Sequence, residues 1–240
     1  MKSLTILLVI FFTGFQIDAR TKQFTTQNLA SPDVSSAIIG TPAALRDSFE
    51  YKSVNLTAQI FNVGTVRQPK EVLLIWHKTG DRFTLAGKKE AFDGESFEKP
   101  VLFQINEYQF VNISTEPVGS GGFVSDAIFW VAPDGTLHEV GFEQASGIYE
   151  TQAASGEVVL TGGDKEFFVE DGQMSFQFWI AEEGDSHCCP SGGVVQGTYK
   201  LEGNPKFDSF ARQYRPDFKI TIDEMQHIPD SSAIQLQASN

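Results

Sequence analysis

Short apolar segments separated by turn residues follow one another through most of the sequence. In the clearest of them, residues 173–181, one side carries Met174, Phe176, Phe178 and Ile180 and the other carries Ser175, Gln177, Trp179 and Ala181. Successive side chains of a β-strand point to opposite faces of the sheet, so this alternation predicts a strand with one buried face. Asp171-Gly172 stands just before it and favours a tight hairpin turn with residues 166–170.

The same reading extends along the chain and fixes the expected fold class. Further strands are predicted at 56–63, 71–78, 124–132, 136–142, 157–161, 194–202 and 218–222, with Pro133-Asp134-Gly135 as a second hairpin turn. Residues 101–114 are long enough for one bent strand or two. The polar residues 81–100 are expected to form a long loop or a weak hairpin. Short helices are predicted from Pro42 to about Phe49 and over 207–214, where Phe207, Phe210 and Tyr214 recur at helical spacing. No long helical period occurs, so we expect a mainly β protein, with antiparallel sheets packed as a sandwich or open barrel and one or two short helices.

The N-terminal residues have the composition of an export signal. Lys2 precedes the apolar run Leu4–Phe15, which is too short to span a bilayer, and Ala19 is a plausible cleavage position. A retained N-terminal anchor is the alternative. We therefore predict a signal peptide at 1–19, a flexible arm at 20–35, a single β-rich domain at 36–228 and a disordered tail at 229–240. The mature protein is expected to be secreted or periplasmic, with no transmembrane segment.

The charge balance excludes one class of partner. The 240 residues carry 18 Lys and Arg against 31 Asp and Glu, a formal net charge of −13. Proteins that bind nucleic acid carry a basic footprint for the phosphates, and this chain is strongly acidic. The sequence therefore predicts no nucleic-acid partner.

The only two cysteines, Cys188 and Cys189, lie between the strands predicted at 173–181 and 194–202. Adjacent Cα atoms lie about 3.8 Å apart, whereas disulfides prefer about 4.4–6.8 Å, so a bond between these neighbours would form a strained ring that shapes a tight loop. Two alternatives stay open: a metal site that includes His187, and two reduced thiols or a redox role. In the disulfide hypothesis, Asp185, His187, Pro190 and Ser191 make the loop contacts.

No catalytic or metal-binding constellation stands out. Asp185-Ser186-His187 is read as chance adjacency, because hydrolase triads are assembled from distant positions and no G-x-S-x-G elbow occurs. Gly119–Gly122 is interpreted as a flexible turn, with a ligand-approach loop as the alternative. The isolated His77, His138 and His227, and the three tryptophans Trp76, Trp130 and Trp179, are interpreted as strand, surface or core residues, although the tryptophans could instead form a sugar-stacking platform. We predict no catalytic residue, no metal ligand and no cofactor.

The segment 176–203, FQFWIAEEGDSHCCPSGGVVQGTYKLEG, resembles a group of uncharacterised exported bacterial proteins. These carry a strand, an acidic turn, CCPS or CCPT, and then a strand that contains tyrosine. The block 119–142, GSGGFVSDAIFWVAPDGTLHEVGF, is similar to their preceding Gly-rich turn and strand. The resemblance covers about residues 100–203. It implies a bacterial envelope location and a role for the cysteine pair, and it implies no catalytic residue.

Export, β architecture and abundant aromatic residues indicate a binding protein. We expect a non-catalytic protein that binds a small molecule, a glycan or an envelope partner, with a loop shaped by the adjacent cysteines. The alternatives are an extracytoplasmic hydrolase and a redox- or metal-responsive protein that uses His187, Cys188 and Cys189.

Overall fold

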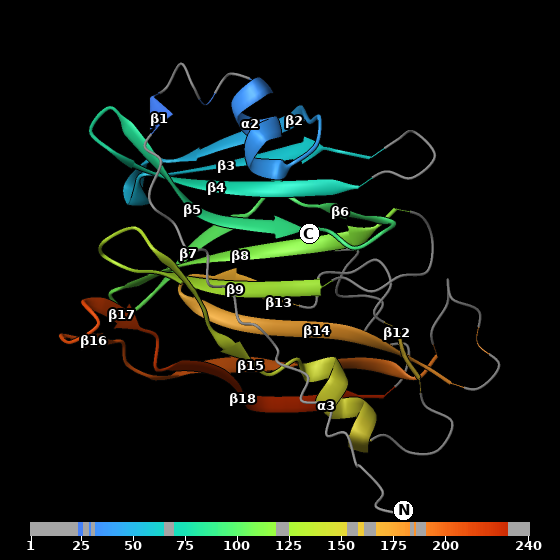
Figure 1. Cartoon of the computed structure of the whole chain (residues 1–240). Coiled ribbons are helices and arrows are strands. Elements are labelled where there is room, and N and C mark those ends of the chain that lie inside the picture. The colour runs from blue at the N-terminus through green and yellow to red at the C-terminus, as the bar shows by residue number, and fades with distance from the viewer. Residues whose placement is uncertain are drawn as a thin grey trace, which may run out of the picture.

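The structure is a computed structural model that describes residues 24–25, 29, 32–64, 70–118, 125–152, 158–160, 167–182, 185 and 191–229. Four predicted features lie outside these residues: the signal peptide, the Gly119–Gly122 turn, the cysteine pair and all but the first residue of the C-terminal tail. The described chain is mainly β, with antiparallel sheets and two short α-helices, as the sequence predicts (Figure 1). Its strands form three larger sheets and one two-stranded hairpin.

The N-terminal sheet is an antiparallel meander with the strand order β1-β5-β4-β3-β2. Its apolar runs supply both faces, because β4 is buried over its first six residues. The elements of this part of the chain are β1 (Phe24–Thr25), α2 (Pro32–Ile39), β2 (Ala44–Tyr51), the 3₁₀ turn η1 (Lys52–Val54), β3 (Leu56–Asn62), β4 (Glu71–Thr79) and β5 (Arg82–Glu90).

The middle sheet has the order β10-β9-β8-β6, and β7 also pairs with β8. The segment 101–114, which the sequence left as one bent strand or two, forms two strands joined by a tight turn in which Asn106 has a positive φ of 53°. The strands are β6 (Glu95–Phe97), β7 (Val101–Ile105), β8 (Tyr108–Pro117), β9 (Ser125–Val131) and β10 (Leu137–Glu139).

The C-terminal sheet has the order β11-β18-β15-β14-β12, with β13 also paired to β14. All its pairs are antiparallel except β11 with β18. The elements are β11 (Gly141–Phe142), α3 (Ala145–Gln152), β12 (Val158–Leu160), β13 (Phe167–Glu170), β14 (Gln173–Ala181), β15 (Gly193–Gly203) and β18 (Phe218–Ile228), and the separate hairpin β16 (Lys206–Asp208) and β17 (Gln213–Arg215) lies between β15 and β18.

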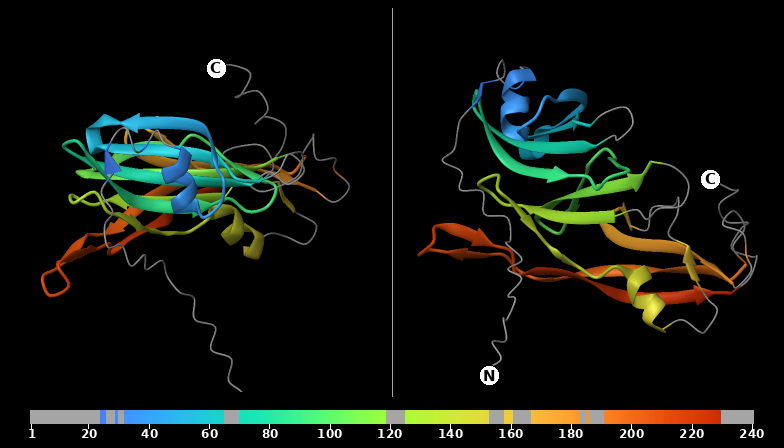
Figure 2. Two further views of the ribbon diagram at one scale, coloured as in Figure 1. Left: turned by 45° about the horizontal axis from the view of Figure 1, so that its top comes forward. Right: turned by 45° about the vertical axis from the view of Figure 1, so that its right-hand side comes forward.

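The three sheets are stacked, and a hydrophobic cluster fills each interface (Figure 2). One face of the N-terminal sheet packs on the chain around α2, where Leu29 contacts the cluster of Trp76 and Phe83. Its other face packs on the middle sheet through Ile60, Leu73 and neighbouring residues. The middle sheet in turn packs on the inner face of the C-terminal sheet, which leaves the outer face of the C-terminal sheet at one side of the stack.

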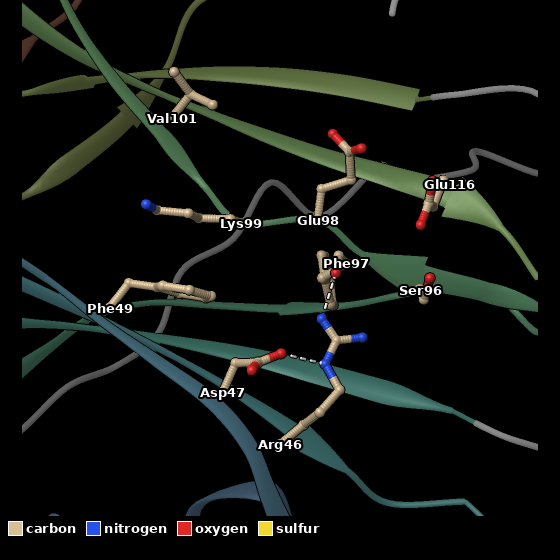
Figure 3. Close-up of a pocket in the computed structure, with 9 residues that line it drawn as sticks. All are labelled: Arg46, Asp47, Phe49, Ser96, Phe97, Glu98, Lys99, Val101 and Glu116. Atoms are coloured by element: carbon tan, nitrogen blue, oxygen red, sulfur yellow. Dashed lines mark hydrogen bonds and ion pairs between the residues drawn. The ribbon is translucent and has the colours of Figure 1, made fainter. Parts of the chain in front are cut away.

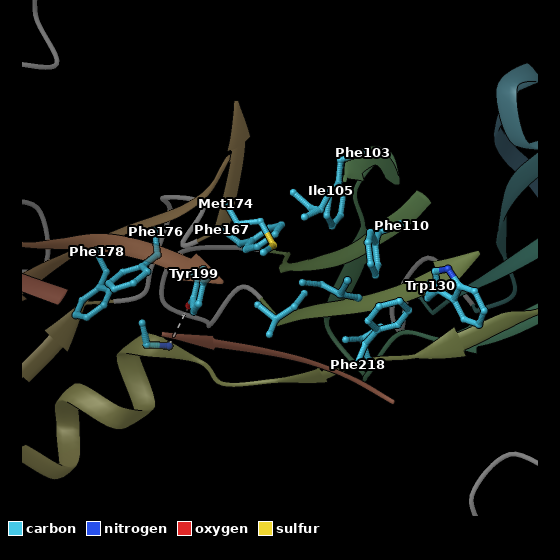
Figure 4. Close-up of a cluster of buried hydrophobic side chains, with 14 of the residues drawn as sticks. Phe103, Ile105, Phe110, Trp130, Phe167, Met174, Phe176, Phe178, Tyr199 and Phe218 are labelled. Atoms are coloured by element: carbon cyan, nitrogen blue, oxygen red, sulfur yellow. Dashed lines mark hydrogen bonds between the residues drawn. The ribbon is translucent and has the colours of Figure 1, made fainter. Parts of the chain in front are cut away.

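The largest cluster joins the middle and C-terminal sheets and is rich in aromatic rings (Figure 4). Phe110 of β8 stacks on Phe103, with ring centroids 5.5 Å apart, and meets Phe218 of β18 edge-on at 5.5 Å. Tyr199 of β15 packs in the same cluster, and its hydroxyl accepts a hydrogen bond of 3.2 Å from the backbone N–H of Ala145 at the start of α3. This bond fixes the helix against the sheet, since the first N–H groups of a helix have no partner within it.

Three expectations are wrong. The helix expected from Pro42 to about Phe49 is absent, because residues 44–51 form strand β2, whose backbone pairs with β3. Residues 207–214 form the β16–β17 hairpin rather than a helix. Residues 82–90 form a full strand, so 81–100 is neither a loop nor a weak hairpin. Within the range predicted as a flexible arm, 20–35, the structure describes a short pairing of residues 24–25 with β5, where Phe24 packs edge-on against Trp76, and the start of α2 at residue 32; the rest of the arm stays a prediction.

The sequence does not predict helix α3, since its eight residues, ASGIYETQ, carry little apolar periodicity. None of the described helices has the length and apolar character needed to cross a membrane.

Candidate functional site

The outer face of the C-terminal sheet is polar. The alternation predicted for 173–181 is confirmed over 174–180 of β14, where Met174, Phe176, Phe178 and Ile180 are buried and Ser175, Gln177 and Trp179 are half-buried; Ala181, expected on the side of Trp179, is buried as well. The first four of these side chains enter the cluster shared with the middle sheet. The polar side chains therefore point away from the stack.

The register of β14, β15 and β18 aligns three glutamines across the sheet. Gln177 is the Cα partner of Gln196, and Gln196 is the partner of Gln226. Neighbouring strands lie about 4.8 Å apart, so the three amides form one row that crosses the strands. We call this the glutamine row.

A second row runs beside it, two residues further along each strand. Ser175 is the partner of Thr198, and Thr198 is the partner of Glu224. Phe168 of β13 is the partner of Ser175 and extends this row with an aromatic ring that is 37% exposed. The face thus combines amides, hydroxyls, a carboxylate and one apolar ring.

These two rows line an open groove of about 880 Å³. Gln177, Gln196 and Gln226 form no side-chain hydrogen bond to any other described residue, so their donors and acceptors are available at the groove. Each amide offers two N–H donors and one carbonyl acceptor. Such a row matches a ligand that is itself rich in groups that both donate and accept, such as hydroxyls.

The charges of the groove disfavour an anionic ligand. Its described lining includes the carboxylates of Glu170 and Glu224 and no lysine or arginine. These two carboxylates would repel an anionic ligand bound in the groove, whereas they would not repel a neutral polar ligand. The groove is therefore suited to a neutral or cationic ligand.

Gly197 lines the groove at a point where its backbone lies very close to Glu224 and Phe176. A Cβ at this position would lie 2.0 Å from the carbonyl oxygen of Glu224 and 2.6 Å from Cζ of Phe176. The register between β15 and β18 shifts just beyond it, between Thr198 and Tyr199. A glycine is required here because the strands approach more closely than a side chain permits.

A second groove, of about 450 Å³, lies between β2 and the segment 96–101, and its arginine, Arg46, is already engaged by protein groups (Figure 3). Arg46 pairs through Nη1 with Oε1 of Glu71 at 2.5 Å and through Nε with Oδ2 of Asp47 at 2.7 Å, and its Nη2 donates to the carbonyl of Phe97 at 2.5 Å. The other carboxylate oxygen of Glu71 accepts from the N–H of Phe97 at 2.7 Å.

Other contacts in this groove also tie β2 to the chain after β6. The ammonium of Lys99 lies over the ring of Phe49, 5.6 Å from its centroid. The hydroxyl of Tyr51 donates to the carbonyl of Pro100, and burial raises the pKa of Tyr51 to about 12. The groove is thus a seam that joins the N-terminal and middle sheets, and the outer face of the C-terminal sheet is the better candidate for a ligand.

The cysteine segment is closed at its base by Asp185. Its Oδ2 accepts hydrogen bonds from the backbone N–H of Glu182 at 2.8 Å and of Ser191 at 2.7 Å, and the Ser191 hydroxyl adds bonds of 2.9 Å. These backbone donors hold the pKa of the Asp185 carboxyl below its ordinary value. Of the predicted loop contacts, the structure brings Asp185 and Ser191 together. His187, Cys188, Cys189 and Pro190 lie outside the described residues, so the disulfide stays a prediction.

The remaining residues singled out by sequence lie apart. His77 is on β4, His138 stacks on Trp130 with ring centroids 5.6 Å apart, and His227 of β18 hydrogen-bonds the hydroxyl of Tyr149 at 3.1 Å. Among the described residues, no group of three or more His, Cys, Asp or Glu side chains could hold a metal ion.

The tryptophans do not form a sugar-stacking platform together. Trp76 is fully buried and Trp130 is 2% exposed, so both are core residues. Trp179 alone is half-buried on the outer face of β14, on the same side as the glutamine row.

Comparison of the chain with protein-family models, with curated protein sequences and with solved structures finds no match. The assignment of function therefore rests on the geometry of the groove.

Proposed function

We propose that this protein is a non-catalytic carbohydrate-binding protein that acts outside the cytoplasm and holds its ligand on the outer face of the C-terminal sheet. The observation that carries the proposal is the glutamine row, in which Gln177, Gln196 and Gln226 stand in register on three adjacent strands. Export is supported by the sequence of residues 1–19.

The chemistry of the face fits a sugar chain better than other small ligands. Amides satisfy the paired hydroxyls of a sugar, since each can donate and accept at once. The ring of Phe168 offers an apolar surface for the C–H face of a sugar, and the ring is 37% exposed beside Ser175. The absence of cations from the described lining favours a neutral saccharide over a phosphorylated or acidic one.

The glutamine row predicts a measurable loss of affinity on mutation. A panel of neutral soluble oligosaccharides, screened by thermal shift, is expected to contain a ligand that raises the Tm of the protein. Gln196→Ala is expected to weaken the binding of that ligand by about tenfold, because it removes one or two hydrogen bonds of about 1 kcal/mol each. Isothermal titration calorimetry measures the affinity.

Gln213→Ala is the matched control, because Gln213 is an exposed glutamine of β17 outside the groove. It is expected to bind with unchanged affinity. The proposal fails if no oligosaccharide shifts the Tm, or if the triple alanine variant of the glutamine row binds as tightly as the wild type. Chromatography of the incubated sugar covers the alternative of a hydrolase, which would release shortened products.

The same proposal includes a loop shaped by a Cys188–Cys189 disulfide. A tight loop is supported by the hydrogen bond of 2.7 Å that the Asp185 carboxylate accepts from the N–H of Ser191. This bond ties together the residues before and after the cysteine segment. A ring between neighbouring cysteines closes almost no loop, so it would act on local shape rather than on global stability.

Mass spectrometry tests the ring. The intact monomer is expected to be lighter by two hydrogens than the reduced chain, and to accept an alkylating reagent only after reduction. Two thiols that react without a reductant would rule out the ring. Metal analysis of the same sample would then address the metal alternative through His187.

A further inference from the structure

The hairpin β16–β17 projects from the body of the molecule (Figure 2). The turn at its end carries an exposed aromatic ring. Phe210, in the turn between the two strands, is 98% exposed, and Phe207 of β16 is 56% exposed. The hairpin thus carries two exposed rings close together, and grouped exposed apolar side chains, unlike single ones, mark contact sites.

The turn that presents Phe210 is held rigidly. Oδ1 of Asp208 accepts from the backbone N–H of Phe210 at 3.0 Å and of Ala211 at 2.9 Å. Its Oδ2 pairs with Nη2 of Arg215 on the opposite strand at 2.8 Å. The exposure of the ring is therefore fixed by a built turn rather than by a loose end of the chain.

The base of the hairpin is anchored in the hydrophobic core. Tyr214 packs edge-on against Trp130, with ring centroids 5.6 Å apart, and Phe207 in turn packs edge-on against Tyr214 at 5.1 Å. Trp130 is 2% exposed and belongs to the core between the middle and C-terminal sheets, so its contact with Tyr214 joins the hairpin to that core.

The charge of the hairpin is opposite to that of the rest of the chain. Residues 206–215 carry the cations Lys206, Arg212 and Arg215 and the single carboxylate Asp208, which gives this segment a net charge of +2 in a chain of net charge −13. Arg215 is paired with Asp208, and Lys206 with Asp217, while Arg212 is exposed next to the tip.

We infer that the hairpin tip docks on an anionic lipid surface. Phe210 inserts among the acyl chains at the interface, followed by the edge of Phe207, and Arg212 contacts the lipid phosphates. Amphipathic cations of this kind keep their charged ends at the headgroup level while their stems and neighbouring aromatic rings lie deeper. Each basic residue near an anionic surface adds attraction that is screened by salt.

The shape and size of the tip favour a lipid surface over a protein partner. The exposed apolar contact consists of two rings on a narrow, projecting hairpin, well below the area of a stable protein interface. A bilayer accepts such a projection at any point of its surface, so it requires no complementary pocket. The strongly acidic body, which an anionic surface repels, leaves the cationic tip as the part that can approach.

Vesicle sedimentation tests the inference with the chain that begins at Arg20. This chain lacks the apolar run 4–15, which would bind lipid by itself. It keeps every residue that the structure describes, because the described residues begin at Phe24. We expect it to sediment with phosphatidylcholine vesicles that contain about a quarter phosphatidylglycerol, and less so as salt is raised. Phe210→Ser is expected to lower the partition onto these vesicles by about tenfold or more, because insertion of a phenyl ring is lost.

Three further variants test the contributions of the ring and of the charge. Phe92→Ser is the matched control, since Phe92 is 75% exposed in the turn between β5 and β6, and it should leave vesicle binding unchanged. Arg212→Glu should reduce binding to the anionic vesicles and have little effect with phosphatidylcholine alone. In Phe210→Trp, the new indole should be quenched by brominated lipids.

Three results would overturn the inference. The wild-type chain fails to sediment with anionic vesicles, or Phe210→Ser sediments as well as the wild type does. In the third, the wild type is a dimer without lipid and Phe210→Ser is a monomer, which would assign the tip to a contact between two copies of the chain. None of these results bears on oligosaccharide binding, which is measured without vesicles.

Discussion

Replacing Glu71 with alanine is expected to lower the free energy of unfolding by about 3 kcal/mol. Glu71 is 6% exposed at the start of β4, and both its carboxylate oxygens are used. One pairs with Arg46 of β2 and the other accepts the N–H of Phe97 of β6. The alanine variant leaves a buried N–H without its acceptor and a guanidinium without its closest counter-charge.

The size of this loss follows from the surroundings of each partner. Removing one member of a buried pair costs about 3–5 kcal/mol, since the other charge stays desolvated. The side chain of Arg46 is 29% exposed and keeps Asp47, so the lower end of the range applies. Urea unfolding followed by tryptophan fluorescence measures the change.

Two control variants make the result specific to the buried pair. Glu202→Ala removes one side of the Lys200–Glu202 pair, whose side chains are about half exposed, and is expected to change stability by less than about 1 kcal/mol. Glu71→Gln keeps an oxygen for the N–H of Phe97 and should fall between the wild type and Glu71→Ala. A loss below about 1 kcal/mol in Glu71→Ala would show that the seam between the N-terminal and middle sheets does not depend on this carboxylate.

The strands could be predicted from sequence where local pattern and tertiary packing agree. On β14, every second side chain meets the core, so the period of two is visible in the sequence itself. The turn before it is equally local, because Asp171 and Gly172 adopt the positive φ values of 48° and 78° that these residue types tolerate.

The helix expected over 207–214 shows how one spacing can arise from two structures. Phe207 and Tyr214 are seven residues apart, which is two turns of a helix, yet they are cross-strand partners in the β16–β17 hairpin. The spacing alone could not separate these structures. The hydrogen bonds of Asp208 to the turn decide for the hairpin, and Asn, Asp and Gly at such positions are the sequence signal that could have indicated it.

The groove could be predicted only in part. Alternation places Gln177 on the face away from the core, as the sequence indicated. Nothing in the sequence aligns it with Gln196 and Gln226, since that depends on the register of three strands and on a register shift between Thr198 and Tyr199. The glutamine row is therefore a product of tertiary structure, whereas the cysteine pair is visible in the sequence because its two residues are adjacent.

Replacing Phe110 with alanine is expected to lower the free energy of unfolding by about 3–5 kcal/mol, because a fully buried ring leaves a cavity that the packed core cannot refill. Phe110 lies at the centre of the cluster between the middle and C-terminal sheets, in contact with Phe103 and Phe218 (Figure 4). Phe110→Leu keeps most of the volume and should lose less. Phe92→Ala, at a ring that is 75% exposed, should change stability by less than about 0.5 kcal/mol.

The same variant separates the role of the core from that of the groove. Phe110 supports the inner face of the C-terminal sheet, whereas the glutamine row lies on its outer face. Under conditions where Phe110→Ala is folded, we therefore expect it to bind an oligosaccharide ligand with an affinity close to that of the wild type, while Gln196→Ala binds weakly and is as stable as the wild type to within about 0.5 kcal/mol. Loss of binding in folded Phe110→Ala would show that the groove depends on the packing beneath it, and a stability loss below about 1 kcal/mol would contradict the place of Phe110 at the centre of the core.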